Sequence, residues 1–242
     1  MILSLIALPV SLIPAIMLFI FLKKKVRPEV QYRKLCNWCL LAGALCSFVI
    51  VACSGVSYVG LKMSGVNDTY PLLYEFLYTF IVLALVEEFV KYITFRLMIQ
   101  IRRYPYSWMD IIALMTIVGL GFDFLESLAL LLTSGPAVLL IRGISIPHAG
   151  YAYIIGYFFG KAKKEGRPWL TALGFVASWL IHGLYDFSLS DMLTEVYPGF
   201  IAIALGIALL DLILVICLCI FIKRKKNDPV YTDPLPCYIS KA

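Results

Sequence analysis

The chain has 242 residues, of which 62% are hydrophobic and only 15% are charged, and its mean hydropathy is +0.90. A water-soluble domain is nearer half apolar and about a quarter charged, so this composition excludes an ordinary soluble globule. It also excludes a disordered chain and a small disulfide-stapled secreted domain. The net charge of +6 would suit nucleic acid, but in so apolar a chain the positive charges must first be placed relative to a bilayer.

Apolar stretches of about 20 residues predict transmembrane helices. The sequence contains seven, at residues 2–22, 35–61, 72–98, 109–132, 138–160, 168–187 and 199–222. The segments between them are short and contain basic clusters or turn signals such as Tyr104-Pro105 and Gly135-Pro136. We therefore expect an all-α, polytopic membrane bundle of about seven transmembrane helices. It would form a single domain over residues 1–226, followed by a flexible cytoplasmic tail over residues 227–242.

Lysine and arginine collect on alternate connecting segments. Those after the first, third, fifth and seventh spans make up 18 of the 21 basic residues: Lys23, Lys24, Lys25, Arg27, Arg33, Lys34, Arg96, Arg102, Arg103, Lys161, Lys163, Lys164, Arg167, Lys223, Arg224, Lys225, Lys226 and Lys241. The exceptions are Lys62, Lys91 and Arg142. Because cytoplasmic segments are enriched in Lys and Arg, the N-terminus is predicted outside and the C-terminus in the cytoplasm. Topology and anionic lipid then explain the positive charge, and we expect no nucleic-acid partner.

Several ionisable side chains lie inside the apolar spans. Near the bilayer centre such a group costs at least about 2.5–3.5 kcal/mol, so it indicates function by default. Four spans carry them: Glu87, Glu88 and Lys91 in the third, Asp123 and Glu126 in the fourth, His148 in the fifth, and His182 and Asp186 in the sixth. They include both histidines of the chain and lie within one layer of the membrane. Four antiparallel helices can therefore bring them into one polar cavity.

Helical spacing pairs these groups. Lys91 follows Glu87 by four residues and Glu88 by three, so it can reach either carboxylate. Asp186 follows His182 by four residues and can fix the tautomer of its imidazole. Two histidines with several glutamates suit a catalytic zinc with an open position for water. The alternative is a metal-free mechanism in which a glutamate acts as general base.

Structural interpretations stand beside these. Asp123 lies off the face shared by Phe122 and Glu126, so we expect it to be structural. Asp211, alone in the middle of the seventh span, is expected to make an interhelical hydrogen bond. Lys91 has the alternative of extending to the inner membrane interface.

The motifs resemble those of one family. Glu87-Glu88-Phe89-Val90-Lys91 resembles the EExxK motif of the PrsW intramembrane proteases, and Phe122-Asp123-Phe124-Leu125-Glu126 resembles their FxxxE element. His148 with Gly156 resembles their third, histidine-containing motif, and His182-Gly183-Leu184-Tyr185-Asp186 resembles their HxxxD motif. Order and spacing agree from residue 87 to residue 186.

This resemblance implies a multi-pass protease of the bacterial cytoplasmic membrane that makes the site-1 cut in a membrane-spanning anti-sigma factor, RsiW-like, during envelope stress. A site-2 protease would then complete release of the sigma factor. PrsW proteins are classed with metalloproteases, whereas the related CAAX prenyl endopeptidases are argued to depend on glutamate, so both mechanisms stay open. Some members of the superfamily are non-catalytic scaffolds, which is one alternative function. A proton- or metal-linked transporter is another, although we expect neither the broken helices nor the repeated halves typical of such folds.

The expected roles are as follows. Glu87 or Glu88 activates water, and Lys91 positions a glutamate. Glu126, His148 and His182 bind zinc or, without metal, stabilise the oxyanion, and Asp186 orients His182. The implied substrate is a single-pass membrane protein within the lipid bilayer.

Overall fold

A computed structural model describes residues 2–102, 104–133 and 136–239. Every element within these ranges is helical, as expected. In chain order they are α1 (Ile2–Lys25), α2 (Val30–Met63), α3 (Val66–Thr69), α4 (Pro71–Phe76), η1 (Leu77–Leu85), α5 (Val86–Ile101), α6 (Trp108–Thr133), α7 (Pro136–Ser145), α8 (Pro147–Glu165), α9 (Trp169–Ser188), α10 (Asp191–Val196), α11 (Phe200–Lys225), α12 (Pro229–Thr232) and α13 (Pro236–Ile239). Of the residues cited from the sequence, Arg103, Gly135 and Lys241 lie outside the described ranges.

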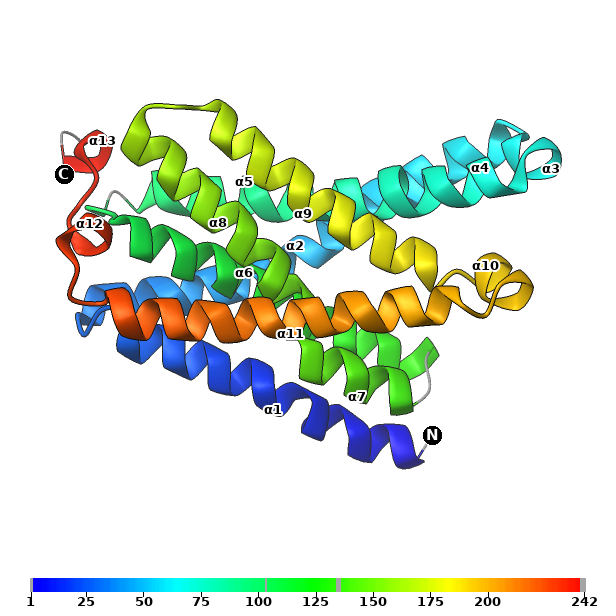
Figure 1. Cartoon of the computed structure of the whole chain (residues 1–242), viewed down its shortest axis with the longest axis horizontal. Helices are drawn as coiled ribbons and strands as arrows, with labels where there is room; N and C mark the ends of the chain where they lie inside the picture. The colour runs from blue at the N-terminus through cyan, green and yellow to red at the C-terminus, as the bar shows by residue number, and fades with distance from the viewer. Residues whose placement is uncertain (1, 103, 134–135, 240–242) are drawn as a thin grey trace.

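Six helical segments of the described chain are long and apolar enough to cross a membrane: Ile6–Lys25, Val30–Met63, Trp108–Leu130, Val138–Glu165, Trp169–Ser188 and Phe200–Lys225. They coincide with six of the seven expected spans. The remaining span, 72–98, is helical throughout but is divided among α4, η1 and α5. Figure 1 shows this run extending along the bundle, with α12 and α13 at one end of the molecule and α3 and α10 at the other. The chain is therefore a multi-pass, all-α membrane protein.

The middle of that divided span is π-helical. The segment η1 has nine residues, and π-helical turns leave backbone carbonyl groups displaced from α-helical bonding. Neighbouring helices satisfy two of these groups. Trp179 Nε1 donates to the carbonyl oxygen of Phe80 at 2.6 Å, and Ser54 Oγ donates to that of Val82 at 2.8 Å. Because η1 ends directly before α5, it sets the rotation with which α5 presents its acidic first turn.

A second irregularity divides the expected span 138–160. Ile146 has φ of 45°, which is unusual for a β-branched residue, and it separates α7 from α8. Pro147 follows directly and disfavours an α-helical conformation at the residue before it. The prediction of one uninterrupted helix without a break is therefore wrong at this point. Such a backbone conformation costs of order 1–3 kcal/mol and is found mostly at functional sites.

The core is organised around α6, which is buried along most of its length between α2 and α8. Two glycines allow the close approach. A Cβ atom on Gly121 would lie 2.1 Å from the carbonyl oxygen of Leu40 in α2. A Cβ atom on Gly119 would lie 2.4 Å from the carbonyl oxygen of His148 in α8. Small residues at helix crossings are the usual way in which membrane helices pack closely, and here they fix the position of α8 against α6.

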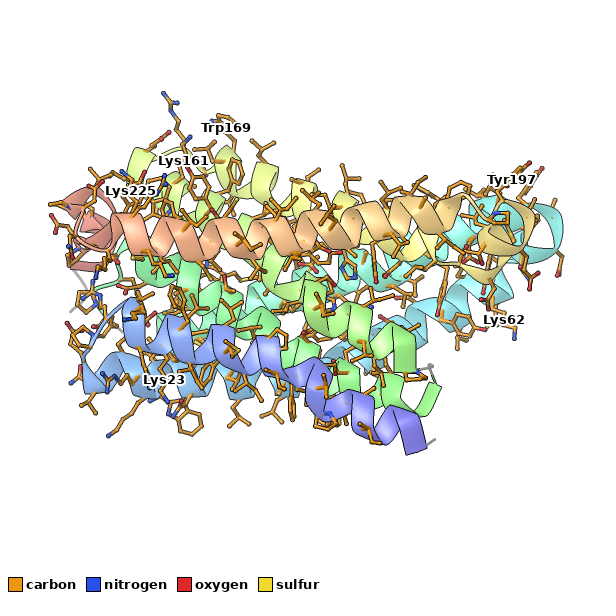
Figure 2. The ribbon with its side chains drawn as sticks, turned by 60° about the horizontal axis from the view of Figure 1, so that its bottom comes forward. Lys23, Lys62, Lys161, Trp169, Tyr197 and Lys225 are labelled. Atoms are coloured by element: carbon orange, nitrogen blue, oxygen red, sulfur yellow. The ribbon has the colours of Figure 1, made fainter. Side chains whose placement is uncertain are left out.

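Basic residues gather at one end of the bundle, which we call the basic end. Figure 2 shows Lys23, Lys161 and Lys225 there, whereas Lys62 lies at the opposite end. The alternation predicted from the sequence is thus reproduced in space, and the assignment of the basic end to the cytoplasm stays a prediction.

The segment expected to be a flexible tail folds back on this end over its described part, to residue 239. The Leu235 amide donates to the Tyr106 carbonyl at 2.9 Å, and the Tyr231 ring packs on Trp108 with 4.8 Å between centroids. Leu235 is buried, which gives an apolar reason for the segment to dock.

Candidate active site

The ionisable residues of the spans converge. Figure 1 shows the helices that carry them packed side by side in the bundle. The cluster draws on α5, α6, α8 and α9, as predicted, and also on α7: Glu87, Glu88, Lys91, Asp123, Glu126, Arg142, His148, His182 and Asp186. We call these nine residues the polar cluster. Its centre is sealed from outside, since the side chains of Glu88, Lys91 and His148 are fully buried.

Glu88 forms the centre of the cluster. Its Oε1 atom lies 2.6 Å from Lys91 Nζ and 2.9 Å from His182 Nδ1. Its Oε2 atom accepts a hydrogen bond from Ser178 Oγ at 3.2 Å. Both oxygens therefore have partners on α5 and α9, so Glu88 is built to hold these two helices together.

Lys91 joins the acidic pair to the first histidine. Its Nζ atom lies 2.8 Å from His148 Nδ1 and 3.9 Å from Glu87 Oε2. The ammonium group also lies over the Phe122 ring, 4.5 Å from the centroid, as in a cation–π contact. The lysine is thus enclosed by partners and does not extend to the membrane interface.

His148 lies between two cations and an acid. Lys91 Nζ is 2.8 Å from Nδ1 and Arg142 Nη2 is 3.1 Å from Nε2, and because both cations can only donate, they make opposite demands on a ring with one proton. With Nδ1 accepting from Lys91, the proton on Nε2 is donated to Glu126 Oε2 at 2.6 Å. Arg142 binds the same carboxylate oxygen, so its charge stabilises Glu126 as an anion. Phe122 contacts the imidazole edge to face at 4.6 Å, which fixes the ring plane.

His182 has a carboxylate on each side of its ring. Nδ1 faces Glu88, while Nε2 lies 3.3 Å from Asp186 Oδ2 and 3.7 Å from Glu87 Oε2. A neutral imidazole donates from one nitrogen only, so the second carboxylate calls for another proton or a metal cation. Tyr151 stacks on the ring with 4.9 Å between centroids and 21° between planes.

Glu87 differs from its neighbour in having an oxygen that makes ion-pair contacts but no hydrogen bond. Its Oε2 atom is buried and has no hydrogen-bond partner among the described residues. The Glu87 side chain is 11% exposed, against 20% for Asp186 and 23% for Glu126. These three acids therefore form the accessible rim of the cluster.

The donor set fits a metal in type and position. Ligand atoms of Glu87, His148 and His182 lie within 4.8 Å of one another, and a second such group comprises Asp123, Glu126 and His148. One carboxylate and two imidazoles are a frequent catalytic zinc set. Five carboxyl groups face only the fixed cations of Lys91 and Arg142, and the Glu87 oxygen that makes no hydrogen bond adds to this demand for a cation. Both nitrogens of His148 already have partners, so ligation there requires Lys91 or Glu126 to move aside.

The predicted ligand trio stays a prediction, and the geometry offers a different group of possible ligands. Glu126, His148 and His182 do not fall in one such group; the group that contains both histidines has Glu87 as its carboxylate. Asp123, expected to be structural, belongs to the group around His148. In the sequence, Arg142 is only an exception to the alternating pattern of basic residues. It also lies within an apolar span, and by the rule that ionisable residues there indicate function it is a candidate site residue. No pattern in the sequence indicated Ser178 or Tyr151.

Asp211 makes the interhelical hydrogen bond expected of it. Tyr151 Oη donates to Asp211 Oδ2 at 3.1 Å, and the Asp211 side chain is buried. Its Oδ1 atom has no hydrogen-bond partner among the described residues. Through Tyr151, the carboxyl group of α11 supports the ring that stacks on His182.

Comparison with known proteins gives one consistent result. The model of a family described as PrsW family intramembrane metalloprotease matches residues 32–219. The chain is similar to three proteins named Protease PrsW. That of Oceanobacillus iheyensis is 31% identical over 118 residues, which cover 47% of this chain and 55% of the relative. That of Geobacillus kaustophilus is 34% identical over 116 residues, covering 46% and 51%.

The third relative, from Bacillus subtilis, is 33% identical over 134 residues, covering 51% of this chain and 59% of its own length. The chain thus spans about half the length of the curated relatives it matches. No solved structure gives a significant match.

Proposed function

The chain belongs to the PrsW family of intramembrane metalloproteases, and from this premise we propose that it is an endopeptidase that cuts a single-pass membrane protein. The substrate we propose is a membrane-spanning anti-sigma factor, RsiW-like, cut at site 1 in the bacterial cytoplasmic membrane. The observation that carries the proposal is the buried Glu87 oxygen that has no hydrogen bond and lies beside both histidines.

Glu87 is the general base in this proposal. Its Oε2 atom is available to accept a proton from water, whereas both oxygens of Glu88 already have partners. The water oxygen attacks the scissile carbonyl carbon as its proton passes to Glu87. When the tetrahedral species collapses and the C–N bond breaks, Glu87 returns that proton to the leaving amine nitrogen. Sequence spacing left open whether Glu87 or Glu88 is the base. In this proposal Glu87 is the base and Glu88 has a positioning role.

The remaining residues position this base and balance charge. Glu88 holds Lys91 and His182 in place, and the Lys91 ammonium, 3.9 Å from Glu87 Oε2, is a fixed positive charge beside the reacting water. Asp186 orients His182, while Glu126 and Arg142 orient His148. These contacts preorganise the cluster before substrate enters.

In the metal-dependent alternative, Glu87, His148 and His182 would hold a zinc ion, with Glu126 and Asp186 supporting the two imidazoles, and Glu87 would then serve as a ligand in place of its role as general base. When bound, the ion supplies Lewis acidity and lowers the pKa of water. Metal analysis of the purified protein, paired with activity after chelation, separates this mechanism from the metal-free one. Loss of both metal and activity on chelation supports zinc, and full activity without metal supports a glutamate mechanism.

The direct test is cleavage of a co-expressed single-pass anti-sigma factor, followed by immunoblot in a host without its own PrsW protein. We expect Glu87→Gln to lower the cleavage rate by about 10²–10⁴-fold, the usual contribution of general acid–base catalysis. Glu75→Gln, on the same helical run but outside the polar cluster, is the control and should cleave normally. If Glu88→Ala and His148→Ala cleave like the wild type, the assignment is wrong.

The break at Ile146 supports a second candidate, a proton- or metal-linked transporter. Transporters place ion sites at the ends of discontinuous helices, and His148 lies in the first turn of α8, directly after the break. Proton or zinc flux into liposomes without cleavage would favour it. A non-catalytic scaffold would show neither flux nor cleavage, and a polar cluster this rich in ionisable groups argues against that role.

A further inference from the structure

A second site lies at the basic end, apart from the polar cluster. A cavity of about 710 Å³ opens there between α5, α8 and α9, and Cys237 of the C-terminal segment contributes to its wall. Its size is within the range of small-molecule and cofactor sites. The walls are largely apolar and include the aromatic rings of Phe159 and Phe175. Neither the proposed function nor the family motifs account for this cavity.

Two cations line the cavity. Arg96 Cζ lies 5.2 Å and Lys163 Nζ 5.5 Å from the centroid of the same Phe159 ring. Arg96 also donates to Tyr92 Oη at 3.0 Å. Within the described part of the chain, no carboxylate forms an ion pair with either one. The neighbouring Lys161 and Arg167 pair with Glu165, so these two cations outside the cavity have a counter-ion that Arg96 and Lys163 lack.

The apolar part of the cavity faces the membrane. Phe89 is 53% exposed and Val176 is 40% exposed. Each lies closer to the middle of its helix than to the end of that helix at the basic end of the bundle. Phe89 lies about two helical turns from Arg96 on α5, so the lining changes from charged to apolar along the membrane normal. A phospholipid has the same order of groups, with a charged head at the interface and chains toward the centre.

We propose that this cavity binds an anionic phospholipid of the leaflet at the basic end, with its phosphate between Arg96 and Lys163. One acyl chain follows the groove between α5 and α9 over Phe89 and Val176. Basic pockets between transmembrane helices are a recognised form of headgroup site. A soluble anion would satisfy the charges but not the apolar, membrane-facing half. The proposal does not depend on peptidase activity.

Native mass spectrometry with dioleoyl phosphatidylglycerol or dioleoyl phosphatidylcholine tests lipid preference. The wild type should retain one phosphatidylglycerol preferentially. The double variant Arg96→Gln/Lys163→Gln should lose about 30-fold of that preference, the combined effect of two charges near the membrane surface. Lys161→Gln/Arg167→Gln removes the same charge from the same end outside the cavity and should stay within about twofold of wild type. Equal losses in the two double variants would overturn the proposal.

Cys237 provides a second measurement on the unaltered protein. Its thiol is exposed and lines the cavity, so its alkylation can be followed by peptide mapping. Phosphatidylglycerol should slow the modification at least severalfold more than phosphatidylcholine, and inorganic phosphate should have no effect. Protection by inorganic phosphate alone would indicate a soluble-anion site, and equal protection by both lipids would indicate no headgroup recognition; either result contradicts the proposal.

Discussion

Two of the sites at which the protein buries charge are built differently. At the basic end, Asp110 is fully buried and completely satisfied. Arg27 Nε donates to its Oδ1 atom at 2.8 Å, and the amide and hydroxyl of Ser107 both donate to Oδ2 at 2.8 Å. Burial alone would lower the pKa of Arg27, but Asp110 outweighs it and raises that pKa above its ordinary value. The buried anion is thus matched by a cation and by hydrogen-bond donors in a structural site.

The polar cluster has no such balance. Its carboxyl groups outnumber Lys91 and Arg142, His182 lies between acids, and one Glu87 oxygen has no hydrogen-bond partner. The contrast shows that burial of charge does not by itself identify a reactive site. A reactive site is indicated where several buried acids lie together with too few cations to compensate them, because a proton, a metal or a substrate can then supply the missing charge.

The largest expected effect separates the two glutamates of the cluster. Glu87→Gln should lower cleavage by about 10²–10⁴-fold with little loss of stability, because its Oε2 atom has no hydrogen bond to lose. Glu88→Gln should lower both cleavage and stability. The free energy of unfolding should fall by about 3–5 kcal/mol, because Lys91 then stays buried without its closest anion. Cleavage assays paired with unfolding in bicelles measure both quantities. The reverse pattern, a stable Glu88 variant and an unstable Glu87 variant, would contradict the assigned roles.

At the Asp110 site we expect the opposite result from Glu87→Gln, namely a loss of stability without a loss of cleavage. Asp110→Asn leaves Arg27 with only its more distant, exposed partner Glu29 and should lower the free energy of unfolding by about 1–3 kcal/mol. Cleavage per folded molecule should be unchanged, because Asp110 does not contact the polar cluster. Glu29→Gln, at an exposed partner of the same arginine, is the control and should change stability by less than about 1 kcal/mol. A specific loss of cleavage in Asp110→Asn would remove the distinction between the sites.

Arg142→Gln should have an intermediate effect. The guanidinium holds Glu126, which in turn orients His148, and loss of such supporting contacts usually lowers activity by about 10–100-fold. Arg142→Lys, which keeps the charge but not the planar geometry, should recover part of that loss. Equal and complete activity in both variants would show that Arg142 only stabilises the fold.

The smallest effect is expected at Asp211. Asp211→Asn still offers Tyr151 an acceptor and should change the free energy of unfolding by less than about 1 kcal/mol. Asp211→Leu leaves the Tyr151 hydroxyl unpaired and should cost about 1–3 kcal/mol. Thermal unfolding of the two variants measures the difference. An Asp211→Asn variant that loses all cleavage would place this residue in the mechanism.

The convergence of the motifs was predictable because i,i+3 and i,i+4 spacing places residues on one helix face. The sequence could not predict that Glu87 is the carboxylate that lies near both histidines. That depends on the rotation of α5 after the π-helical segment η1, and the apolar run Leu77–Leu85 carries no sign of that geometry. The break before His148 did have a signal in Pro147, which the hydropathy of the span obscured. The docked C-terminal segment was missed because its prolines suggested disorder, whereas Leu235 and Tyr231 supply apolar contacts.

The central claim is that the polar cluster itself cleaves a membrane protein, with Glu87 as the base. The most direct measurement is single-turnover cleavage of a purified single-pass substrate by the purified protein in liposomes, comparing wild type with Glu87→Gln. We predict cleavage within the substrate's transmembrane region or at its border by the wild type, and a rate at least 10²-fold lower for an equally stable, folded Glu87→Gln. Equal rates for the two proteins, or no cleavage by a folded wild type, would contradict it.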